Sequence, residues 1–279
     1  MSRGSGLGPR RSLHISTGCD DKESPNVGVL ELFKLDDKVV IVTGASSGLG
    51  VSFAQGFAEA GADLVLAARR ADKMRDTAAL VEAAGRTVQS VVTDVVVPEQ
   101  CQALVDSAMK TFGHVDVLIN NAGVGTAYPA TRETPEQFRS VIDVNLNGAY
   151  WMAQACGRVM EPGSAIINVA SVLGITTAGL PQAAYSASKA GLLGLTRDLA
   201  QQWGSRKGIR VNALAPGMFR SEMTDEYQPG YIESQSHRLL LSRMGEPSEL
   251  AATAVWLASP AGGYVTGQTI VVDGGLTIT

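Results

Sequence analysis

The sequence predicts an α/β protein with a doubly wound parallel sheet of about seven strands and helices on both faces. Short apolar runs rich in β-branched residues, such as KVVIVTG at 38–44, alternate with helical segments of about ten or more residues. This alternation is typical of βαβ units, whose right-handed crossovers leave consecutive strands parallel. The chain has 279 residues, of which 45% are hydrophobic, and is long enough to bury one substantial core.

The elements expected from this pattern follow one another from residue 38 to the end of the chain. We expect strands near 38–44, 62–68, 87–94, 114–123, 164–171, 208–216 and 268–275. We expect helices near 48–60, 71–84, 98–112, 135–160, 183–204 and 247–258. No internal repeat or linker divides this region, so residues 30–279 are predicted to form one domain.

Composition excludes several classes of function. The net charge of −4 provides no sequence-wide basic surface, so nucleic acid is not an expected partner. No apolar run approaches the roughly 18 residues of a membrane span, so no membrane partner is expected either. The three cysteines and three histidines are scattered, which predicts neither a disulfide framework nor a metal site.

Residues 1–29 are predicted to be a flexible N-terminal extension. Gly4, Gly6, Gly8 and Pro9 oppose helix formation there. The segment is also rich in serine and arginine and has no acid before Asp20, a composition found in organellar transit peptides. Because the glycines work against the amphipathic helix of a transit peptide, we favour a plain extension and a cytoplasmic location.

A glycine-rich turn, TGASSGLG, follows the first expected strand. Its spacing differs from the Gly-x-Gly-x-x-Gly of the common dinucleotide fingerprint. The physical reason for glycine is the same, because small residues let the backbone approach a pyrophosphate at the N-terminus of a helix. The turn is therefore a predicted pyrophosphate site, with hydroxyl donors from two serines. Its candidate residues are Gly44, Ser46, Ser47, Gly48 and Gly50.

The end of the second expected strand indicates which dinucleotide binds. An acid at this place binds the adenosine ribose of NAD, whereas an arginine receives the 2′-phosphate of NADP. The strand here ends Ala67-Ala68-Arg69-Arg70 and has no acid. A pair of arginines at a loop is often only solvated surface, but its place predicts NADP(H) as the preferred coenzyme, with NAD(H) second. Arg69 is the main candidate for the phosphate contact, and Arg70 is the alternative.

Polar residues also close the third and fourth expected strands. Asp94 is placed either to accept a hydrogen bond from an adenine amino group or simply to cap its turn. Asn120, Asn121 and Gly123 close the fourth strand. These strand ends share the carboxyl edge of a parallel sheet, the usual ligand crevice. Asn145 is an unusual polar interruption of the long helix expected at 135–160.

The segment 171–189 carries the candidate chemistry. Tyr185 and Lys189 are four residues apart on an expected helix and therefore share a face. A neighbouring ammonium favours the phenolate and brings the pKa of a tyrosine toward the range useful for acid–base catalysis. Ser171, upstream, offers a hydroxyl that can hold a carbonyl oxygen. Alone, Tyr-x3-Lys is more often an ordinary surface pair, but the surrounding motifs favour catalysis.

TGASSGLG, NNAG, Asn145, Ser171, YSASK and APG at 215–217 occur in one order along the chain. That order resembles the short-chain dehydrogenase/reductase family in its compact single-domain form, over about residues 30–279. The resemblance implies a Rossmann-type fold and an NAD(P)-dependent oxidoreductase that interconverts a ketone and a secondary alcohol. Ser171 precedes Tyr185 by 14 residues, one more than in many relatives, which we interpret as a loop insertion.

The resemblance also assigns roles to residues. It implies a tetrad in which Tyr185 is the acid–base, Ser171 orients the substrate carbonyl, Lys189 binds the nicotinamide ribose and lowers the pKa of Tyr185, and Asn145 supports a proton relay through water. The predicted cofactor-binding set is Gly44, Ser46, Ser47, Gly48, Leu49, Gly50, Arg69, Arg70, Asp94, Val95, Asn121, Ala122, Gly123, Tyr185, Lys189, Pro216, Gly217 and Ser221.

Two further stretches bear on substrate and assembly. LFKLDDK and APGMFRSEMT are most similar to gluconate 5-dehydrogenase and 3-oxoacyl-ACP reductase types, which implies a keto-sugar acid or a 3-oxoacyl thioester as substrate. Residues 218–241, with Phe219, Tyr227 and Tyr231, are expected to form a lid over it. Gly191 and Gly194 among leucines, the apolar C-terminal run and the resemblance together predict a homotetramer.

Two other functions are compatible with the predicted fold. One is a catalytically idle NAD(P)-binding sensor, against which the intact Ser171, Tyr185 and Lys189 set argues. The other is an epimerase or dehydratase related to longer members of the family, which have a separate C-terminal substrate region. The length of this chain leaves little room for such a region, so the oxidoreductase is the favoured hypothesis.

Overall fold

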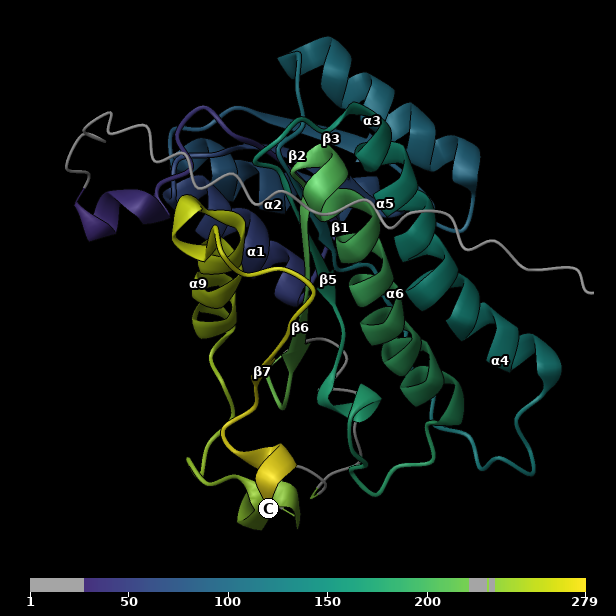
Figure 1. Ribbon diagram of the computed structural model, residues 1–279. Helices are drawn as coiled ribbons and strands as arrows, with labels where there is room; N and C mark the ends of the chain where they lie inside the picture. Colours follow the sequence, from purple (N-terminus) through teal and green to yellow (C-terminus); the bar gives the residue numbers. More distant parts are fainter. Residues whose placement is uncertain (1–27, 221–229, 231–233) are drawn as a thin grey trace, which may run out of the picture.

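The computed structural model describes residues 28–220, 230 and 234–279. A seven-stranded sheet forms its centre, with the strand order β3-β2-β1-β4-β5-β6-β7 (Figure 1). Every neighbouring pair of strands is parallel. The chain first builds the sheet outward from β1 to β3 and then returns to add β4 beside β1. This reversal is the topological switch point of a doubly wound sheet, and the predicted fold class is confirmed.

The strands are short and mostly apolar. They are β1 (Val39–Thr43), β2 (Asp63–Ala68), β3 (Val88–Val92), β4 (Val117–Asn120), β5 (Ala165–Val169), β6 (Arg210–Pro216) and β7 (Thr269–Val272). The inner strands β1, β4 and β5 are buried along their whole length. Continuous burial is expected for a parallel sheet that is covered by helices on both faces. The edge strands β3 and β7 are only partly buried.

Seven α-helices connect the strands of the described part of the chain. They are α1 (Leu49–Glu59), α2 (Ala71–Ala83), α3 (Pro98–Phe112), α4 (Pro135–Ile142), α5 (Gly148–Val159), α6 (Ala183–Lys207) and α9 (Pro247–Ala258). Short helical turns complete the description: η1 (Val29–Phe33), η2 (Asp143–Asn147), η3 (Val172–Gly174), η4 (Ser236–Arg238), η5 (Pro260–Gly262) and η6 (Leu276–Ile278). None of these helices is long and apolar enough to cross a membrane.

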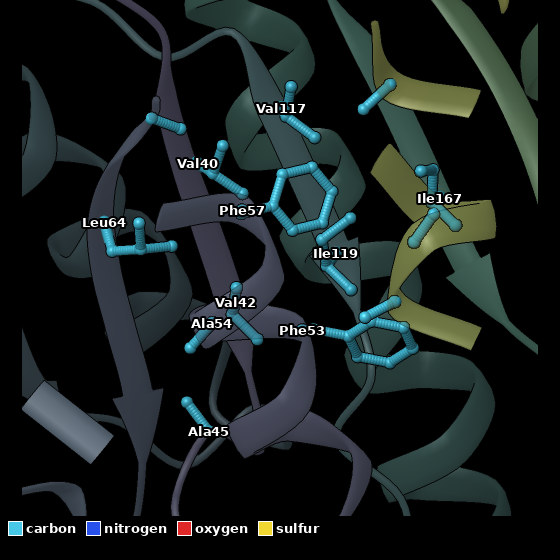
Figure 2. Packing of buried hydrophobic residues seen from close by; sticks show 14 of the residues in the cluster. Val40, Val42, Ala45, Phe53, Ala54, Phe57, Leu64, Val117, Ile119 and Ile167 are labelled. Carbon is cyan, nitrogen blue, oxygen red and sulfur yellow. The ribbon is translucent and has the colours of Figure 1, made fainter. Parts of the chain in front are cut away.

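Two apolar layers hold the helices against the sheet. One layer joins α1, α2 and α9 to one face, and the other joins α3, α5 and α6 to the opposite face. The rings of Phe53 and Phe57 on α1 lie over Val42 of β1 and Ile119 of β4 (Figure 2). Fully burying such side chains stabilises the fold by about 1.5–3 kcal/mol each. The switch point between β1 and β4 is thus covered by fully buried side chains of the core.

The observed elements differ from the expected ones in two places. The helix expected at 135–160 is interrupted by η2, a π turn that contains Asn145. The helix that carries Tyr185 extends to Lys207 and ends where Gly208 adopts the left-handed conformation, with φ 65°. Both changes follow from local backbone hydrogen bonding rather than from hydrophobic periodicity, which is why the pattern of apolar residues did not reveal them.

The prediction that Phe219 covers the substrate is wrong. Phe219 is 4% exposed and packs in the layer of α1 and α9. Its ring fills space above Gly245, to which its backbone is paired. Burial of the ring is favourable there, so it is unavailable for a ligand. Tyr227 and Tyr231, the other aromatic residues of the expected lid, lie outside the described residues.

The role expected for Gly191 is also corrected. A Cβ atom at this position would lie 2.9 Å from Cδ2 of Leu146 in the same chain. Close approach at Gly191 therefore serves packing between α6 and η2 within the chain. Gly194 has open space on the same helix, with only a guanidinium nitrogen of Arg197 at 4.0 Å.

Candidate active site

A crevice of ≈260 Å³ lies at the carboxyl edge of the sheet, around the switch point. Most of the predicted cofactor residues line it. They are Gly44, Ser46, Ser47, Gly48, Leu49, Arg69, Arg70, Asp94, Val95, Asn121, Ala122, Gly123, Tyr185, Lys189 and Pro216. The structure adds residues that are not in the predicted cofactor-binding set, namely Ala67, Ala68, Thr93, Val124, Val144, Val169 and Ala170.

The glycine turn between β1 and α1 lies flat against the end of β4. Gly44 and Gly48 have φ values of 67° and 54°, which L side chains rarely adopt. A Cβ at Gly44 would lie 2.9 Å from Cα of Ala122, and one at Gly50 would collide with the carbonyl oxygen of Gly44. No side chain caps the N-terminus of α1. Its first backbone N–H groups therefore point toward the turn, an arrangement suited to an anion.

A buried threonine ties the turn to β4. The hydroxyl of Thr43 accepts hydrogen bonds from the backbone N–H groups of Asn121 and Ala122, each at 3.0 Å. The Asn121 amide donates in return to the carbonyl oxygens of Thr43 and Gly44, at 2.9 and 3.3 Å. Sequence reasoning missed Thr43. The available signal was a polar residue at the last position of an otherwise apolar, buried strand.

The two arginines after β2 are placed differently. Arg70 donates to the hydroxyl of Ser47 at 2.7 Å and to that of Ser46 at 3.2 and 3.3 Å. Arg69 is exposed and also lines the crevice. A planar guanidinium held by two hydroxyl groups is oriented beside the glycine turn. The structure therefore positions Arg70 more firmly than Arg69, the residue that the sequence favoured.

Asp94 occupies the turn after β3. Its carboxylate oxygen Oδ1 accepts a hydrogen bond from the backbone N–H of Val96 at 3.2 Å, and its own N–H donates to Gln100 Oε1 at 2.8 Å. The turn-capping role that the sequence left open is thus present. Asp94 also lines the crevice, so capping and ligand contact are compatible.

Tyr185 and Lys189 meet in the same crevice, one turn apart on α6. The Lys189 ammonium lies 5.6 Å from the centre of the Tyr185 ring and donates to the carbonyl oxygen of Val169 at 2.7 Å. Burial lowers the pKa of Lys189 from 10.5 to about 8, because water is replaced by a medium that disfavours the charge. Lys189 therefore remains mostly protonated at pH 7.

Asn145 and Ser171 lie beside the crevice and do not line it. Asn145 is buried in η2, and its amide oxygen accepts from the backbone N–H of Val124 at 2.8 Å. Ser171 follows β5 directly, and its hydroxyl accepts from the N–H of Leu173 at 3.1 Å. Ser171 therefore caps η3 in this structure, at the end of the strand that supplies Val169 to the crevice wall.

Two further predicted residues that the structure describes, Gly50 and Gly217, do not line the crevice. Gly50 packs beneath Gly44, as described above. Gly217 lies against Asp273, where a Cβ would come within 2.7 Å of the Asp273 Cα. Ser221 lies outside the described residues. Among the residues that the structure does describe, no group of three or more His, Cys, Asp or Glu side chains is arranged to hold a metal ion.

A family model described as Enoyl-(Acyl carrier protein) reductase matches residues 44–277, most of the chain and all of the described crevice. The chain belongs to the short-chain dehydrogenase/reductase family. Galactitol 2-dehydrogenase (L-tagatose-forming) of Cereibacter sphaeroides is 40% identical over 253 residues, which cover 88% of this chain and 98% of that protein. The 3-oxoacyl-[acyl-carrier-protein] reductase of Thermotoga maritima is 36% identical, over 88% of this chain and 100% of the relative.

Solved structures of the family have the same fold. A short-chain type dehydrogenase/reductase from Mycobacterium marinum superposes with a TM-score of 0.86 at 33% identity, over 90% of this chain and 100% of the other. Members of the short-chain dehydrogenase/reductase family bind NAD(P) cofactors and act on alcohol or ketone substrates. This chain is accordingly an oxidoreductase.

Proposed function

We propose that the protein is an NADP(H)-dependent oxidoreductase that interconverts a ketone and a secondary alcohol, with Tyr185 as the acid–base. The observation that carries this proposal is the shared crevice. Tyr185 and Lys189 line the same cavity as the glycine turn and the arginines that follow β2. A dinucleotide that lies across the switch point of a doubly wound sheet would contact all of them.

The residues of the crevice fit such a coenzyme. Gly44 and Gly48 have conformations that bring the backbone to the surface of the turn, and α1 offers its uncapped N-terminus there. The Lys189 ammonium has three donors, of which one goes to Val169. The others suit hydroxyl groups of a ribose. When bound, the nicotinamide group supplies or accepts the hydride.

The chain itself handles the proton. In the direction of reduction, the Tyr185 hydroxyl would donate its proton to the developing alkoxide, and in oxidation the phenolate would take it back. The Lys189 ammonium beside the ring favours the phenolate and so eases both steps. Ser171 would hold the substrate oxygen after its hydroxyl turns from the N–H of Leu173. Asn145, in the π turn η2, would support a proton relay through water.

The preference for NADP(H) rests on the strand end without an acid. Ala68 closes β2, and the guanidinium groups of Arg69 and Arg70 follow it. Hydrogen bonds to charged groups contribute about 1.5–3 kcal/mol, which corresponds to roughly 10- to 150-fold in affinity. We infer that Arg70 shares the 2′-phosphate with Arg69.

The variants Arg69→Ala and Arg70→Ala test this inference. The kcat/KM of each variant with NADPH and with NADH measures the contribution of each arginine to NADPH binding, and Arg75→Ala on α2 is the control. Equal or better use of NADH by the wild-type protein would contradict the preference.

The substrate class is proposed from the relatives, either a keto-sugar acid or a 3-oxoacyl thioester. A panel with 5-ketogluconate, a 3-oxoacyl thioester and simple cyclic diketones tests it through NADPH oxidation. Tyr185→Phe should lower turnover of the best ketone by about 100-fold or more while coenzyme binding stays unchanged. If the coenzyme binds but no ketone is reduced, the protein is an idle sensor. If Tyr185→Phe keeps half of the parent rate, Tyr185 has no part in the mechanism.

We also propose a homotetramer in the cytoplasm whose catalytic domain begins near residue 30. The edge strand β7 leaves Val271 38% exposed, and Ile278 of η6 is 79% exposed. Apolar groups at a sheet edge are typical of a buried interface. Light scattering at micromolar concentration measures the assembly, and a monomer would contradict the proposed tetramer.

Cell fractionation tests the proposed cytoplasmic location. Deletion of residues 1–29 tests the proposed domain boundary, which loss of activity would contradict.

A further inference from the structure

The buried hydroxyl of Ser188 connects two elements of the candidate active site, the helix α6 and the π turn η2. The sequence motifs gave this serine no role. Ser188, one residue before Lys189 on α6, is fully buried. Its hydroxyl donates to the carbonyl oxygen of Tyr185 at 2.7 Å and accepts from the Asn145 amide at 3.0 Å. The first bond lies within the turn of α6 that carries Tyr185, and the second reaches across to the π turn η2.

The carboxamide of Asn145 is occupied on both sides. Its oxygen accepts from the backbone N–H of Val124, and its nitrogen donates to the carbonyl oxygen of Val124 at 2.9 Å as well as to Ser188. Val124 lines the crevice in the loop after β4. We call Val124, Asn145 and Ser188 the three-way junction, because they join the loop after β4, η2 and α6.

The side chains of the three-way junction are held in fixed positions. Asn145 and Ser188 are each at most 1% exposed, so water has no access to replace a lost hydrogen bond. Gly123 lies beside both groups: a Cβ there would be in van der Waals contact with Asn145 Oδ1 at 3.4 Å and with Lys189 Nζ at 3.6 Å. A change in the spacing between η2 and α6 would therefore move Lys189 relative to the crevice wall.

We propose that Ser188 is a positioning residue, which holds the turn of α6 with Tyr185 and Lys189 in register with the π turn of Asn145. This inference rests on the proposed function, because it assumes that Tyr185 transfers the proton. Ser188 itself does not line the crevice and touches no reacting group. Its contribution is to keep the Tyr185 hydroxyl and the Lys189 ammonium at a fixed separation, on which the acidity of the phenol depends.

The test uses Ser188→Ala with Ser186→Ala as the matched control. Ser186 lies on the same turn of α6 and is only partly buried. We expect Ser188→Ala to lower kcat for the best ketone of the panel about 10-fold, the scale of a small misplacement of catalytic groups. NADPH affinity should change less than about 3-fold, and the pKa that governs kcat should move upward. Ser186→Ala should leave all three unchanged.

A double-mutant cycle identifies the path of the effect. If Ser188 acts through Asn145, its substitution should have little further effect on kcat in an Asn145→Ala background. Ser188→Thr keeps the hydroxyl and should restore most of the rate. If threonine proves too large for the buried site, the double-mutant cycle alone tests whether Ser188 acts through Asn145. If Ser188→Ala does not fold, Ser188→Cys takes its place.

Three results would overturn the proposal. They are an unchanged kcat and pH profile in Ser188→Ala, an equal loss in Ser186→Ala, or full additivity in the cycle. Tyr185→Phe is measured beside these variants. An active Tyr185→Phe protein would refute the proposed function itself. An inactive one, together with an unaffected Ser188→Ala protein, would refute only the positioning role.

Discussion

Two cationic side chains at opposite edges of the sheet, the buried Lys189 and the partly buried Arg210, have very different surroundings. Arg210 begins β6 at the amino edge, and its guanidinium donates to the carbonyl oxygens of Leu257, Ala258, Ser259 and Gly262, at the end of α9 and in η5. Lys189 lies at the carboxyl edge and donates to the carbonyl oxygen of Val169. Burial lowers the pKa of both side chains.

The difference separates a structural cation, Arg210, from one that we propose to be functional, Lys189. The carbonyl groups at the C-terminus of α9 carry the negative end of the helix dipole and lack partners within the helix. Arg210 satisfies them and links α9 to β6. Lys189 keeps donor capacity for a ligand, and the protein bears the cost of burying its charge. Such a cost, in a crevice, is typical of a catalytic position.

The largest expected effect is loss of activity at the carboxyl edge. Lys189→Met should lower kcat/KM by about 100-fold or more, equivalent to about 2.7 kcal/mol of transition-state stabilisation. The reason is loss of both the proposed ribose contact and the cation beside Tyr185. Steady-state kinetics on the best ketone measures it. Arg210→Met is the matched control and should retain the kcat of the folded protein. Equal losses of kcat in the two variants would remove the distinction.

The second prediction concerns stability at the amino edge. Arg210→Met should lower the free energy of unfolding by about 2–3 kcal/mol, because it leaves the carbonyl groups of α9 and η5 without their donor. The methionine recovers part of the apolar contact of the arginine stem, which limits the loss. Urea unfolding followed by circular dichroism measures the change. An unaltered unfolding midpoint would show that solvent or neighbouring N–H groups replace the guanidinium.

The third prediction is a pH-dependent gain in stability at Lys189. The folded-state pKa of about 8 lies below the ordinary value of 10.5. Between these values the unfolded chain binds more protons, so the stability of the wild-type protein rises with pH in that window. Below about pH 8 the full free-energy cost of burying the charged lysine is present. This cost is roughly 3 kcal/mol, because each unit of pKa shift corresponds to about 1.36 kcal/mol. The hydrogen bond to Val169 offsets about 1–2 kcal/mol of it.

Lys189→Met should therefore be about 1–2 kcal/mol more stable than the wild-type protein at pH 7. The advantage should shrink as the pH rises from about 8 toward 10.5, where the lysine is neutral in the folded state and half protonated in the unfolded state. Unfolding midpoints without coenzyme, measured at several pH values between 7 and 10.5, give the difference. A methionine variant that is less stable at pH 7, or a difference independent of pH, would contradict the conclusion that the buried Lys189 ammonium lowers the stability of the fold.

The smallest expected effect sharpens the role of the guanidinium. Arg210→Lys keeps the charge but replaces a rigid fork by a single ammonium with three donors. We expect it to lose about 1 kcal/mol of stability, since some carbonyl groups would lose their donor. The same urea unfolding assay distinguishes the stability loss of Arg210→Lys from the larger loss expected for Arg210→Met. If lysine and methionine were equally destabilising, geometry rather than charge would account for the whole contribution.

Much of the crevice could be predicted from short motifs at strand ends. Parallel strands share one carboxyl edge, so the turn at Gly44, the arginines after β2, Asp94 and Asn121 were expected to converge, and all of them line the crevice. The helical spacing of Tyr185 and Lys189 predicted a shared face. The relative weight of Arg69 and Arg70 was not predictable, because it depends on which guanidinium reaches the hydroxyl groups of Ser46 and Ser47.

The sequence by itself determined the architecture of this protein. Periodicity and glycine placement specify which residues form strands and helices and which ends face a ligand. Only the tertiary structure decided the neighbours of single side chains. It placed Phe219 in the core, set Gly191 against Leu146, and joined Asn145 to Ser188. These contacts connect elements far apart in the chain, and packing of complementary shapes selects them without leaving a periodic signal.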